Sequence, residues 1–563
     1  MSKKLFMPLI VAVLAVLTSC SSKMGALSSD YFTVTPQVLE AVGGKVPATI
    51  NGRFPAKYFN KKAVVQVTPV LRWNGGQAAG QTMTFQGEKV LGNGQTVSYA
   101  NGGNFTLRTE FDYVPQMAKS ELYLDFNVRV GKKTLTVPSV KVADGVISTS
   151  ELLSNTLNNA NASLGEDAFQ RIIKEKLQGE IMFLIQQSNI RSSEERVARN
   201  FNQEVKELQN TPNRRIENIE VSAYASPDGA LDLNRGLAEK RQDNTAKLVN
   251  NNLKRENMDL NVNTSYTAED WEGFKELVEQ SNIQDKDLIL RVLSMYQDPE
   301  QREREIKNIS SVYKNLADDI LPKLRRSRLT ANYEIIGKSD EEISQLARTN
   351  PRELTVEEIL YAATLTNDAA LKQDIYTKAS QQYANDYRAL NNLGKLAYEA
   401  GDYDKAETLL RQAQRVKDAP EINNNLALLA LKKGNLTEAE SLLGKASGAK
   451  ELAETMGNLY IAQGQYERAV NSFGDTKTNS AALAQILAKD YNKSNATLEA
   501  VKNADAYTDY LKAVLGARTN NENMVMNSLR NAISKDPSLA TKAATDLEFA
   551  KFFTNSSFTS LLK

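Results

Sequence analysis

The residues best suited to bind a ligand lie between Ile216 and Leu253. Apolar and polar residues alternate from Ile219 to Tyr224, and this period of two predicts a half-buried strand. The strand ends at Ser226–Gly229, where proline presets its own φ and glycine accepts a positive φ. We therefore expect a sharp turn at the end of this strand, with Asp228 as its charged residue.

A helix is predicted after this turn, with Asp232 as its N-cap. Asn234, Leu237 and Arg241 follow at intervals of three and four residues, so they share one face of that helix. The strand end, the turn with Ser226, and the helix face therefore converge on one polar pocket. The chemistry expected there is the binding of a ligand.

The composition argues against catalysis. The 563 residues include no His and one Cys, which excludes imidazole catalysis, Ser–His triads, thiol nucleophiles and ordinary zinc sites. A hydrolase that uses only carboxylates stays open, but no Asp or Glu pair stands out by its spacing. Lys and Arg number 69 against 68 Asp and Glu, which leaves no net field to attract nucleic acid. We expect no enzyme, metal, cofactor or nucleic-acid partner.

The turn and helix resemble the signature of OmpA-like peptidoglycan-binding domains. Tyr224–Gly229 is similar to the family pattern G-[HY]-T-D-x-x-G, and Asn234, Leu237 and Arg241 match N-x-x-L-[SA]-x-x-R. The resemblance implies a central α/β (α+β) domain that binds the diaminopimelate side chain of the peptidoglycan stem peptide. That ligand carries a carboxylate beside an ammonium, so its pocket needs a bidentate donor and a nearby anion. Arg241 matches the family's arginine.

The anion departs from the family pattern, because Ser226 stands where the family has its aspartate. Asp228, two residues further on, supplies the missing charge in one alternative. In the others, the domain binds a variant stem peptide or binds nothing, and the helix-start Asn and the Arg are simply solvated.

The amino terminus has the pattern of a signal peptide. Two lysines precede the apolar run Leu5–Leu17, which is too short to span a bilayer. Leu17–Cys20 resembles a bacterial lipobox, which implies removal of residues 1–19 and lipid modification of Cys20, and a plain secretory signal is the alternative. Acyl chains anchor a protein firmly. The two serines after Cys20 resemble an outer-membrane sorting signal, so we expect a lipid-anchored outer-membrane protein that faces the periplasm.

After a lipidated tether over residues 20–30, residues 31–147 predict a β domain. Apolar and polar residues alternate over Glu121–Val130, and Gly131–Lys133 turns into Thr134–Val140, which predicts a hairpin. Strands separated by Gly and Asn clusters predict a β-sandwich of immunoglobulin-like type. We interpret this domain as a spacer or a protein-interaction module.

Residues 148–178 are predicted to be a connector on the surface, with a short helix over Glu166–Leu177. The OmpA-like domain is then expected over residues 179–337. Ile181–Gln186 would be its first strand, and a capping box that starts at Ser192 would open its first helix.

The second half of this domain is longer than the minimal family member. Helical patterns between Asp270 and Ala317 predict a helical insertion before the last strand, Leu329–Ile336. Leu324–Arg328 resembles the basic segment that precedes the family's last strand and would help to hold stem-peptide carboxylates, with a solvated basic helix end as the alternative. The enlarged arrangement resembles OmpA-like proteins of Bacteroidetes, some of them linked to fimbriae or surface assemblies.

Residues 338–563 are predicted to be helical. A pattern of glycine, a bulky residue and alanine starts at Gly401, Gly434 and Gly464, at intervals of 33 and 30 residues. This pattern resembles tetratricopeptide (TPR) repeats, whose period is about 34 residues. Each repeat buries its face only against its neighbours. The resemblance implies an all-α TPR solenoid with a protein partner on its concave surface, and packing on a neighbouring domain is the alternative.

The sequence therefore predicts a noncatalytic multidomain lipoprotein. In the first hypothesis, it tethers the envelope to peptidoglycan through Arg241 and its neighbours and scaffolds a protein partner through the repeats. In the second, it belongs to a surface-assembly or secretion complex of fimbrial type, and its peptidoglycan pocket is vestigial.

Overall fold

The computed structural model describes residues 24–283, 286–309, 314 and 316–563. The chain divides into two compact units, one formed by Met1–Glu166 together with Asp368–Lys563 and the other by Asp167–Asn367. The predicted signal peptide and Cys20 lie outside the described residues. Across the described ranges, no helix combines the length and the apolar character needed to cross a membrane.

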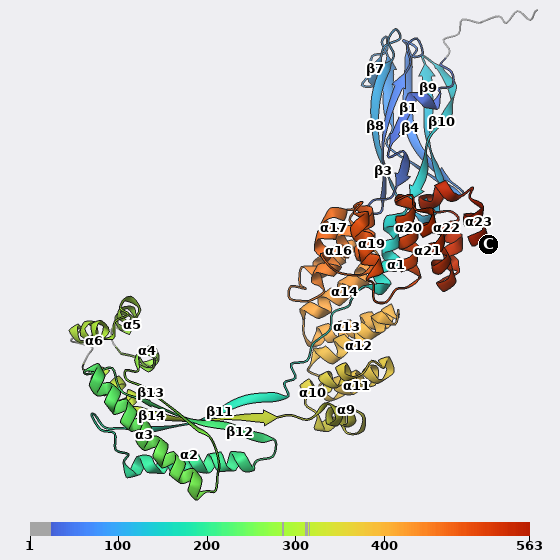
Figure 1. Ribbon diagram of the computed structural model, residues 1–563. Coiled ribbons are helices and arrows are strands. Elements are labelled where there is room, and N and C mark those ends of the chain that lie inside the picture. The colour runs from blue at the N-terminus through green and yellow to red at the C-terminus, as the bar shows by residue number, and fades with distance from the viewer. Residues whose placement is uncertain (1–23, 284–285, 310–313, 315) are drawn as a thin grey trace, which may run out of the picture. The chain divides into compact units, whose positions relative to one another are not determined.

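The N-terminal part of the first unit is built from two β-sheets (Figure 1). One sheet has the order β1-β3-β8, and the other has the order β2-β10-β9-β4-β6-β7 with β5 paired to β4. Both sheets contribute to one apolar core, to which Ile50 and Leu107 come from the smaller sheet and Val65 and Leu124 from the larger one. The immunoglobulin-like assignment stays a prediction. The strands are β1 (Phe32–Thr35), β2 (Val38–Glu40), β3 (Lys45–Phe54), β4 (Ala63–Trp73), β5 (Gly76–Ala79), β6 (Met83–Gly87), β7 (Gln95–Val97), β8 (Gly103–Asp112), β9 (Ser120–Val130) and β10 (Lys133–Ile147).

The predicted hairpin is present. β9 and β10 pair antiparallel with Val130 opposite Lys133, and Gly131 between them has a φ of 61°. Leu122 and Leu124 are fully buried because the alternation places them on the core side of the sheet.

The C-terminal part of the first unit consists of paired helices (Figure 1). Gly401, Gly434 and Gly464 lie in the turns within three successive pairs, with φ values of 78°, 74° and 73°. These values confirm that the repeated glycines serve turns that favour glycine. The helices are α11 (Ala369–Gln382), α12 (Tyr387–Glu399), α13 (Tyr403–Val416), α14 (Pro420–Lys432), α15 (Leu436–Leu443), α16 (Leu452–Ala462), α17 (Tyr466–Phe473), α18 (Asn479–Leu487), α19 (Tyr491–Glu499), α20 (Ala506–Arg518), α21 (Glu522–Lys535), α22 (Ser538–Ala543), η8 (Leu547–Phe552) and α23 (Ser556–Leu561).

The segment after β10 is not the surface connection that the sequence predicted. It forms the short turns η3 (Thr149–Leu152), α1 (Leu153–Thr156) and η4 (Leu157–Asn159) and then runs extended. Leu152 and Leu157 are 1% and 0% exposed, and both belong to the same core as the repeat helices. Burial of these leucines removes apolar surface from water, which a connector on the surface would not do.

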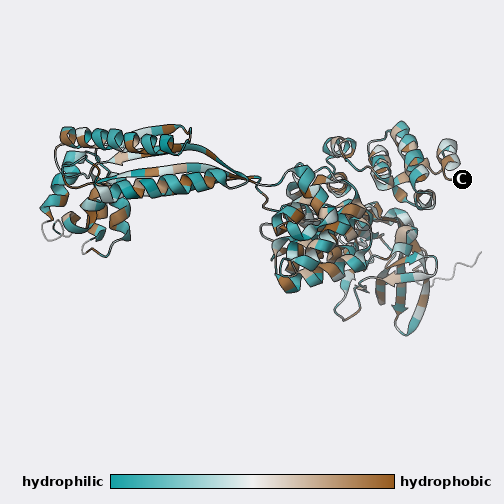
Figure 2. Ribbon diagram, turned by 90° about the horizontal axis from the view of Figure 1, so that it is seen from below, coloured by the Kyte–Doolittle hydropathy of each residue, from teal (hydrophilic) through white to brown (hydrophobic). Residues whose placement is uncertain are grey.

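The second unit contains a four-stranded sheet of order β11-β14-β12-β13. β12 and β13 are parallel, and the other pairs are antiparallel. The helices α2 and α3 pack against the sheet, and Figure 2 shows that both are largely hydrophilic, with apolar residues interspersed. The core between them includes Phe201, Val221, Val249 and Leu329. The elements are β11 (Ile172–Met182), α2 (Ser192–Asn210), β12 (Arg214–Tyr224), α3 (Leu231–Arg255), β13 (Val262–Thr267) and β14 (Arg326–Ile336).

The start of this unit differs from the sequence prediction. Residues 172–177, predicted as helix, belong to β11, and the strand predicted over Ile181–Gln186 ends at Met182. β11 pairs with β14 along its whole length, and most of its residues are exposed. Its polar composition therefore lacks the apolar alternation by which a strand is predicted.

Both helices predicted next are present, but their predicted N-caps are wrong. The capping box at Ser192 does not form, because α2 has Arg191 as its N-cap and Glu194 accepts a hydrogen bond from the Met182 amide at 2.9 Å. α3 begins at Leu231 rather than after Asp232, whose carboxylate pairs with Arg235 at 2.9 Å.

The predicted helical insertion lies between β13 and β14. Phe274, Ile289, Ile306 and Leu324 form its own small core. Its described elements are α4 (Trp271–Gln280), α5 (Lys286–Met295), α6 (Pro299–Asn308), the π-helical turn η5 (Leu316–Ile320) and α8 (Leu321–Leu324), and the unit ends with α9 (Asp340–Thr349) and α10 (Val356–Ala362).

Candidate functional site

The turn between β12 and α3 brings together the residues predicted to bind a ligand. The Asp228 amide donates to the Ser226 carbonyl at 2.8 Å, and Gly229 has a φ of 121°. Asn234 is buried on α3 and donates from Nδ2 to the Gly229 carbonyl at 3.4 Å, whereas Leu237 is half-buried. The strand end, the turn and the helix face therefore meet.

Arg241 lies on the same helix but is only 1% exposed. Its Nε donates to the Gln187 carbonyl at 2.9 Å, its Nη1 to the Tyr224 carbonyl at 2.9 Å, and its Nη2 to the Leu184 carbonyl at 3.4 Å. The guanidinium also lies 5.0 Å from the centre of the Phe183 ring. Burial, with the nearby Arg325, lowers its pKa to about 10.

The expectation that Arg241 offers its guanidinium to a carboxylate ligand is therefore not met in this conformation. A guanidinium has five N–H donors, and backbone carbonyls of its own unit engage all three of its nitrogens. Three of the five donors are thereby occupied, and because the side chain is 1% exposed, a ligand carboxylate would reach the other two only after the covering backbone moved.

Asp228, the predicted anion, also has an internal partner. Arg325 lies 3.3 Å from the Asp228 carboxylate through Nη2 and donates from Nε to the Ser226 hydroxyl at 3.3 Å. The Ser226 hydroxyl is hydrogen-bonded to the same carboxylate. The side chains of Arg325 and Asp228 are 12% and 19% exposed, so this ion pair is largely shielded from water.

The helical insertion closes over the turn. The Gly229 amide donates to the Glu303 carboxylate of α6 at 2.9 Å. Pro227 and Asp228 border a small space whose other walls include Trp271, Phe274 and Ile306. The sequence predicted this insertion but not where it packs.

Arg326 and Arg328 of the predicted basic segment lie on β14, which begins three residues earlier than predicted, and both are paired with acids rather than open to stem-peptide carboxylates. Arg326 lies 3.2 Å from Asp270 and 3.3 Å from Glu180, and Arg328 lies 3.4 Å from Glu180. Burial of Asp270 raises its pKa, although the Gly273 amide and Arg326 act to lower it.

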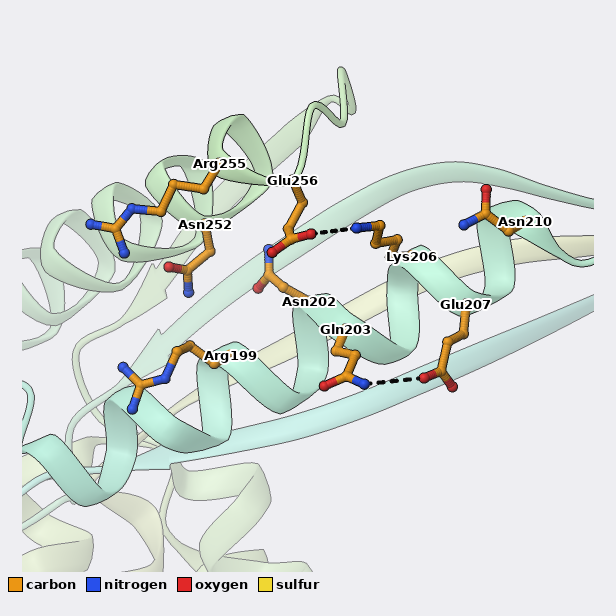
Figure 3. A pocket seen from close by; sticks show the side chains of 9 residues that line it. All are labelled: Arg199, Asn202, Gln203, Lys206, Glu207, Asn210, Asn252, Arg255 and Glu256. Carbon is orange, nitrogen blue, oxygen red and sulfur yellow. Dashed lines mark hydrogen bonds and ion pairs between the residues drawn. The ribbon is translucent and has the colours of Figure 1, made fainter.

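A second hollow lies between α2 and α3 and was not predicted (Figure 3). Its volume is about 580 Å³, and an ion pair between Lys206 and Glu256 at 2.5 Å crosses it. Cations and carboxylates both line it, so its charges single out no ligand. Within the described ranges, no cluster of three or more His, Cys, Asp or Glu residues is placed to hold a metal ion.

One face of the C-terminal helices, formed by α12, α14 and α16 (below, the inner face), binds the extended end of the segment after β10. The Ser163 amide donates to Asn425 Oδ1 at 2.6 Å, and its carbonyl accepts from Asn425 Nδ2 at 2.8 Å and Asn391 Nδ2 at 3.1 Å. The Gly165 amide donates to Asn392 Oδ1 at 2.8 Å, and its carbonyl accepts from Asn392 Nδ2 at 3.0 Å. Asparagine side chains thus replace the backbone partners of a β-strand.

Charged side chains extend this contact. The Glu454 carboxylate accepts from the Asn161 amide at 3.1 Å and from its Nδ2 at 2.8 Å. Lys395 donates to the Ala162 carbonyl at 2.7 Å. The segment is therefore held by α12, α14 and α16 at once.

A sequence signal for this face exists. Asn392, Asn425 and Asn458 recur at intervals of 33 residues, the period that separates Gly401 from Gly434. All three asparagines are at most 2% exposed. Asn392 and Asn425 bind the backbone of the segment, whereas Asn458 Nδ2 donates to the Glu454 carbonyl of its own helix at 3.1 Å, so the repeated amide marks the peptide contacts at the first two of the three positions.

Comparison with known families now gives the C-terminal part its class. A family model for the tetratricopeptide repeat matches residues 368–417 and 391–450. The C-terminal region contains tetratricopeptide repeats. The predicted repeats at Gly401 and Gly434 are confirmed, and the paired helices α11–α23 (below, the repeat domain) include the matched repeats.

Solved structures give weaker similarities. A tetratricopeptide repeat protein from Parabacteroides merdae is 15% identical over 38% of this chain and 91% of its own, with a TM-score of 0.29. The Cut9–Hcn1 hetero-tetramer of the APC/C matches at 11% identity, over 66% of this chain and 75% of that chain (TM-score 0.29). Yeast Tom70 matches at 11% identity, over 58% and 79% (TM-score 0.25). No curated protein matches the chain.

Glu454 predicts a pH dependence of the repeat domain. Burial raises the pKa of this carboxyl above its ordinary 4.5, although both hydrogen bonds from Asn161 act to lower it. The folded state therefore binds more protons than the unfolded chain, and the stability from this group is full below pH 4.5 and is lost as pH rises through the folded pKa. Glu454→Gln should remove that loss.

The measurement is urea unfolding at several pH values between 4.5 and 8. The stability of Glu454→Gln relative to the natural protein should increase as pH rises. Glu440→Gln, at an exposed position on α15, is the matched control. Parallel curves for the natural protein and Glu454→Gln would contradict the expectation.

Proposed function

We propose that the protein is a noncatalytic scaffold, anchored to the outer membrane by lipid on Cys20, whose central domain has lost an open peptidoglycan pocket. It corresponds to the second of the two functions predicted from the sequence, in which the protein belongs to a surface-assembly or secretion complex of fimbrial type and its peptidoglycan pocket is vestigial. Tetratricopeptide repeats support a role in protein–protein scaffolding. The single observation that carries the choice is that Arg241 and Asp228 both have their partners inside their own unit.

The chemistry of the stem peptide explains why this observation decides. Its carboxylate would have to reach a guanidinium that is 1% exposed and already donates to three carbonyls, and its ammonium would have to replace Arg325 at Asp228. Breaking buried pairs leaves unpaired polar groups, each of which costs about 1–3 kcal/mol. New contacts with the stem peptide would first have to offset these costs, which leaves little free energy for binding.

The peptidoglycan tether is the second candidate. The observation in its favour is that Ser226, Asp228, Asn234 and Arg241 gather at one turn, which is what the resemblance to OmpA-like domains implies. The OmpA-like assignment, the diaminopimelate ligand and the periplasmic orientation are proposals as well.

Co-sedimentation with purified peptidoglycan sacculi separates the two candidates. We expect the natural protein to stay in the supernatant, because its turn is closed. Asp228→Asn is the test variant, and Asp232→Asn, whose side chain is 92% exposed in the first turn of α3, is the matched control.

The tether would be supported if the natural protein and Asp232→Asn sediment while Asp228→Asn does not. The same samples also report on hydrolysis. Release of soluble muropeptides would support the alternative that the protein is a hydrolase that uses only carboxylates. Arg241→Ala is unsuitable as the binding-null variant, because the loss of this buried side chain should strongly destabilise the unit.

A further inference from the structure

The inner face of the repeat domain is already a filled peptide site. We propose that its ligand is the chain's own segment Leu157–Gly165 and that no partner protein enters this face while the segment is bound. The inference goes beyond the scaffold role, because it states that partners of the repeat domain bind to another surface.

The first step of the argument is that the site recognises backbone. Both the amide and the carbonyl of Ser163 and of Gly165 are bound by asparagine side chains, at distances between 2.6 and 3.1 Å. Asn391, Asn392 and Asn425 are at most 2% exposed, so water does not compete for their hydrogen bonds. Hydrogen bonds of this buried kind fix an extended peptide in one register.

The second step is that the site selects small residues. Ala160, Ala162 and Ser163 are buried to 6%, 2% and 1% exposure. A Cβ added at Gly165 would lie 3.0 Å from the Cβ of Arg388, which is tighter than ordinary contact. The ligand class is therefore an extended peptide with small side chains at these four positions.

The third step is that the segment is also anchored upstream. Leu157 is fully buried, and its carbonyl accepts a hydrogen bond from the Tyr398 hydroxyl. The Thr156 hydroxyl bonds the Ser480 hydroxyl of α18 at 2.9 Å, and both residues are fully buried. The segment thus contacts the repeat domain from α12 to α18.

The fourth step is competition. A ligand joined covalently to its site competes at an effective concentration of the order of millimolar. A partner peptide that binds the same face as tightly as the segment does, but is present at micromolar concentration, would therefore stay largely unbound. The covalent connection keeps the face committed to its own segment.

Hydrogen exchange on the intact chain is the first test. The amides of Asn161, Ser163 and Gly165 donate to side chains of the repeat domain, so they should exchange as slowly as the helix amides of α14. Exchange at the rate of a free peptide would overturn the proposal. Gly165→Ala should accelerate exchange at these three amides, because its Cβ crowds Arg388.

Binding in trans is the second test. A labelled peptide of residues 149–166 should not bind the natural chain, and it should bind a full-length variant in which Leu157–Gly165 is replaced by an equally long Gly/Ser sequence. Within that variant, Asn392→Ala and Asn425→Ala should each weaken binding about tenfold. Asn471→Ala, at an exposed position on α17, should leave it unchanged.

The outcomes separate this inference from the scaffold role. Equal binding of the peptide by the natural chain would mean that the segment exchanges, and a folded Gly/Ser variant that does not bind it would mean that the face is no peptide site. Either result overturns the inference and leaves the scaffold role intact. If the Gly/Ser variant does not fold, the exchange measurement on the natural chain decides.

Discussion

Arg241→Ala is expected to destabilise the central unit by about 3–5 kcal/mol. The side chain is 1% exposed, and its removal leaves the carbonyls of Leu184, Gln187 and Tyr224 without a donor and opens a cavity beside Phe183. Urea unfolding measured by the fluorescence of Trp271 in a Trp73→Phe background would report on this unit.

Arg235→Ala is the matched control for this measurement. Arg235 lies on the same helix with a side chain that is 51% exposed and pairs with Asp232, so its loss should change stability by less than about 0.5 kcal/mol. If Arg241→Ala proves as stable as Arg235→Ala, the guanidinium is not held by the carbonyls. The peptidoglycan tether would then become the better candidate.

Arg518→Ala is expected to destabilise the first unit by about 3–5 kcal/mol. Arg518 of α20 lies 2.9 Å from Glu40 of β2 through Nη2, donates from Nε to Glu548 of η8 at 2.9 Å, and donates from Nη1 to the Ile486 carbonyl at 3.4 Å. The side chains of Arg518 and Glu548 are 12% and 5% exposed, so its loss leaves the Glu548 carboxylate buried without a cation.

Unfolding of this unit can be followed by Trp73 in a Trp271→Phe background. Arg518→Ala combined with Glu548→Gln should recover part of the lost free energy, because the buried charge is then removed. Arg530→Ala, at an exposed position on α21, is the control and should have little effect. A double variant no more stable than Arg518→Ala would show that the cost does not come from the stranded carboxylate.

The features that the sequence predicted correctly depend on local chemistry. Gly401, Gly434 and Gly464 were recognised because each turn needs a residue that accepts a positive φ, and that need is met by the residue itself. The hairpin at Gly131 follows in the same way from an alternation on both sides of a turn. Such signals span a few residues and do not depend on the rest of the chain.

The features that the sequence missed depend on pairs far apart in the chain. The helix face that carries Arg241 was predicted correctly, but two of the three carbonyls that bind it come from the loop after β11, whose path no local pattern specifies. Arg325 and Asp228 are separated by 97 residues. Ser163 and Asn425 are separated by 262 residues, and neither a serine nor an asparagine by itself indicates a buried position.

The segment that fills the inner face of the repeat domain has a consequence for biosynthesis. Leu152, Leu153 and Leu157 leave the ribosome before the helices that cover them, and the whole of Asp167–Asn367 is made in between. The nascent chain therefore carries uncovered leucines until its C-terminal helices arrive, which is the state that chaperones recognise. A prematurely terminated chain would keep those leucines exposed to proteases, so full-length translation becomes a condition for the survival of the N-terminal half.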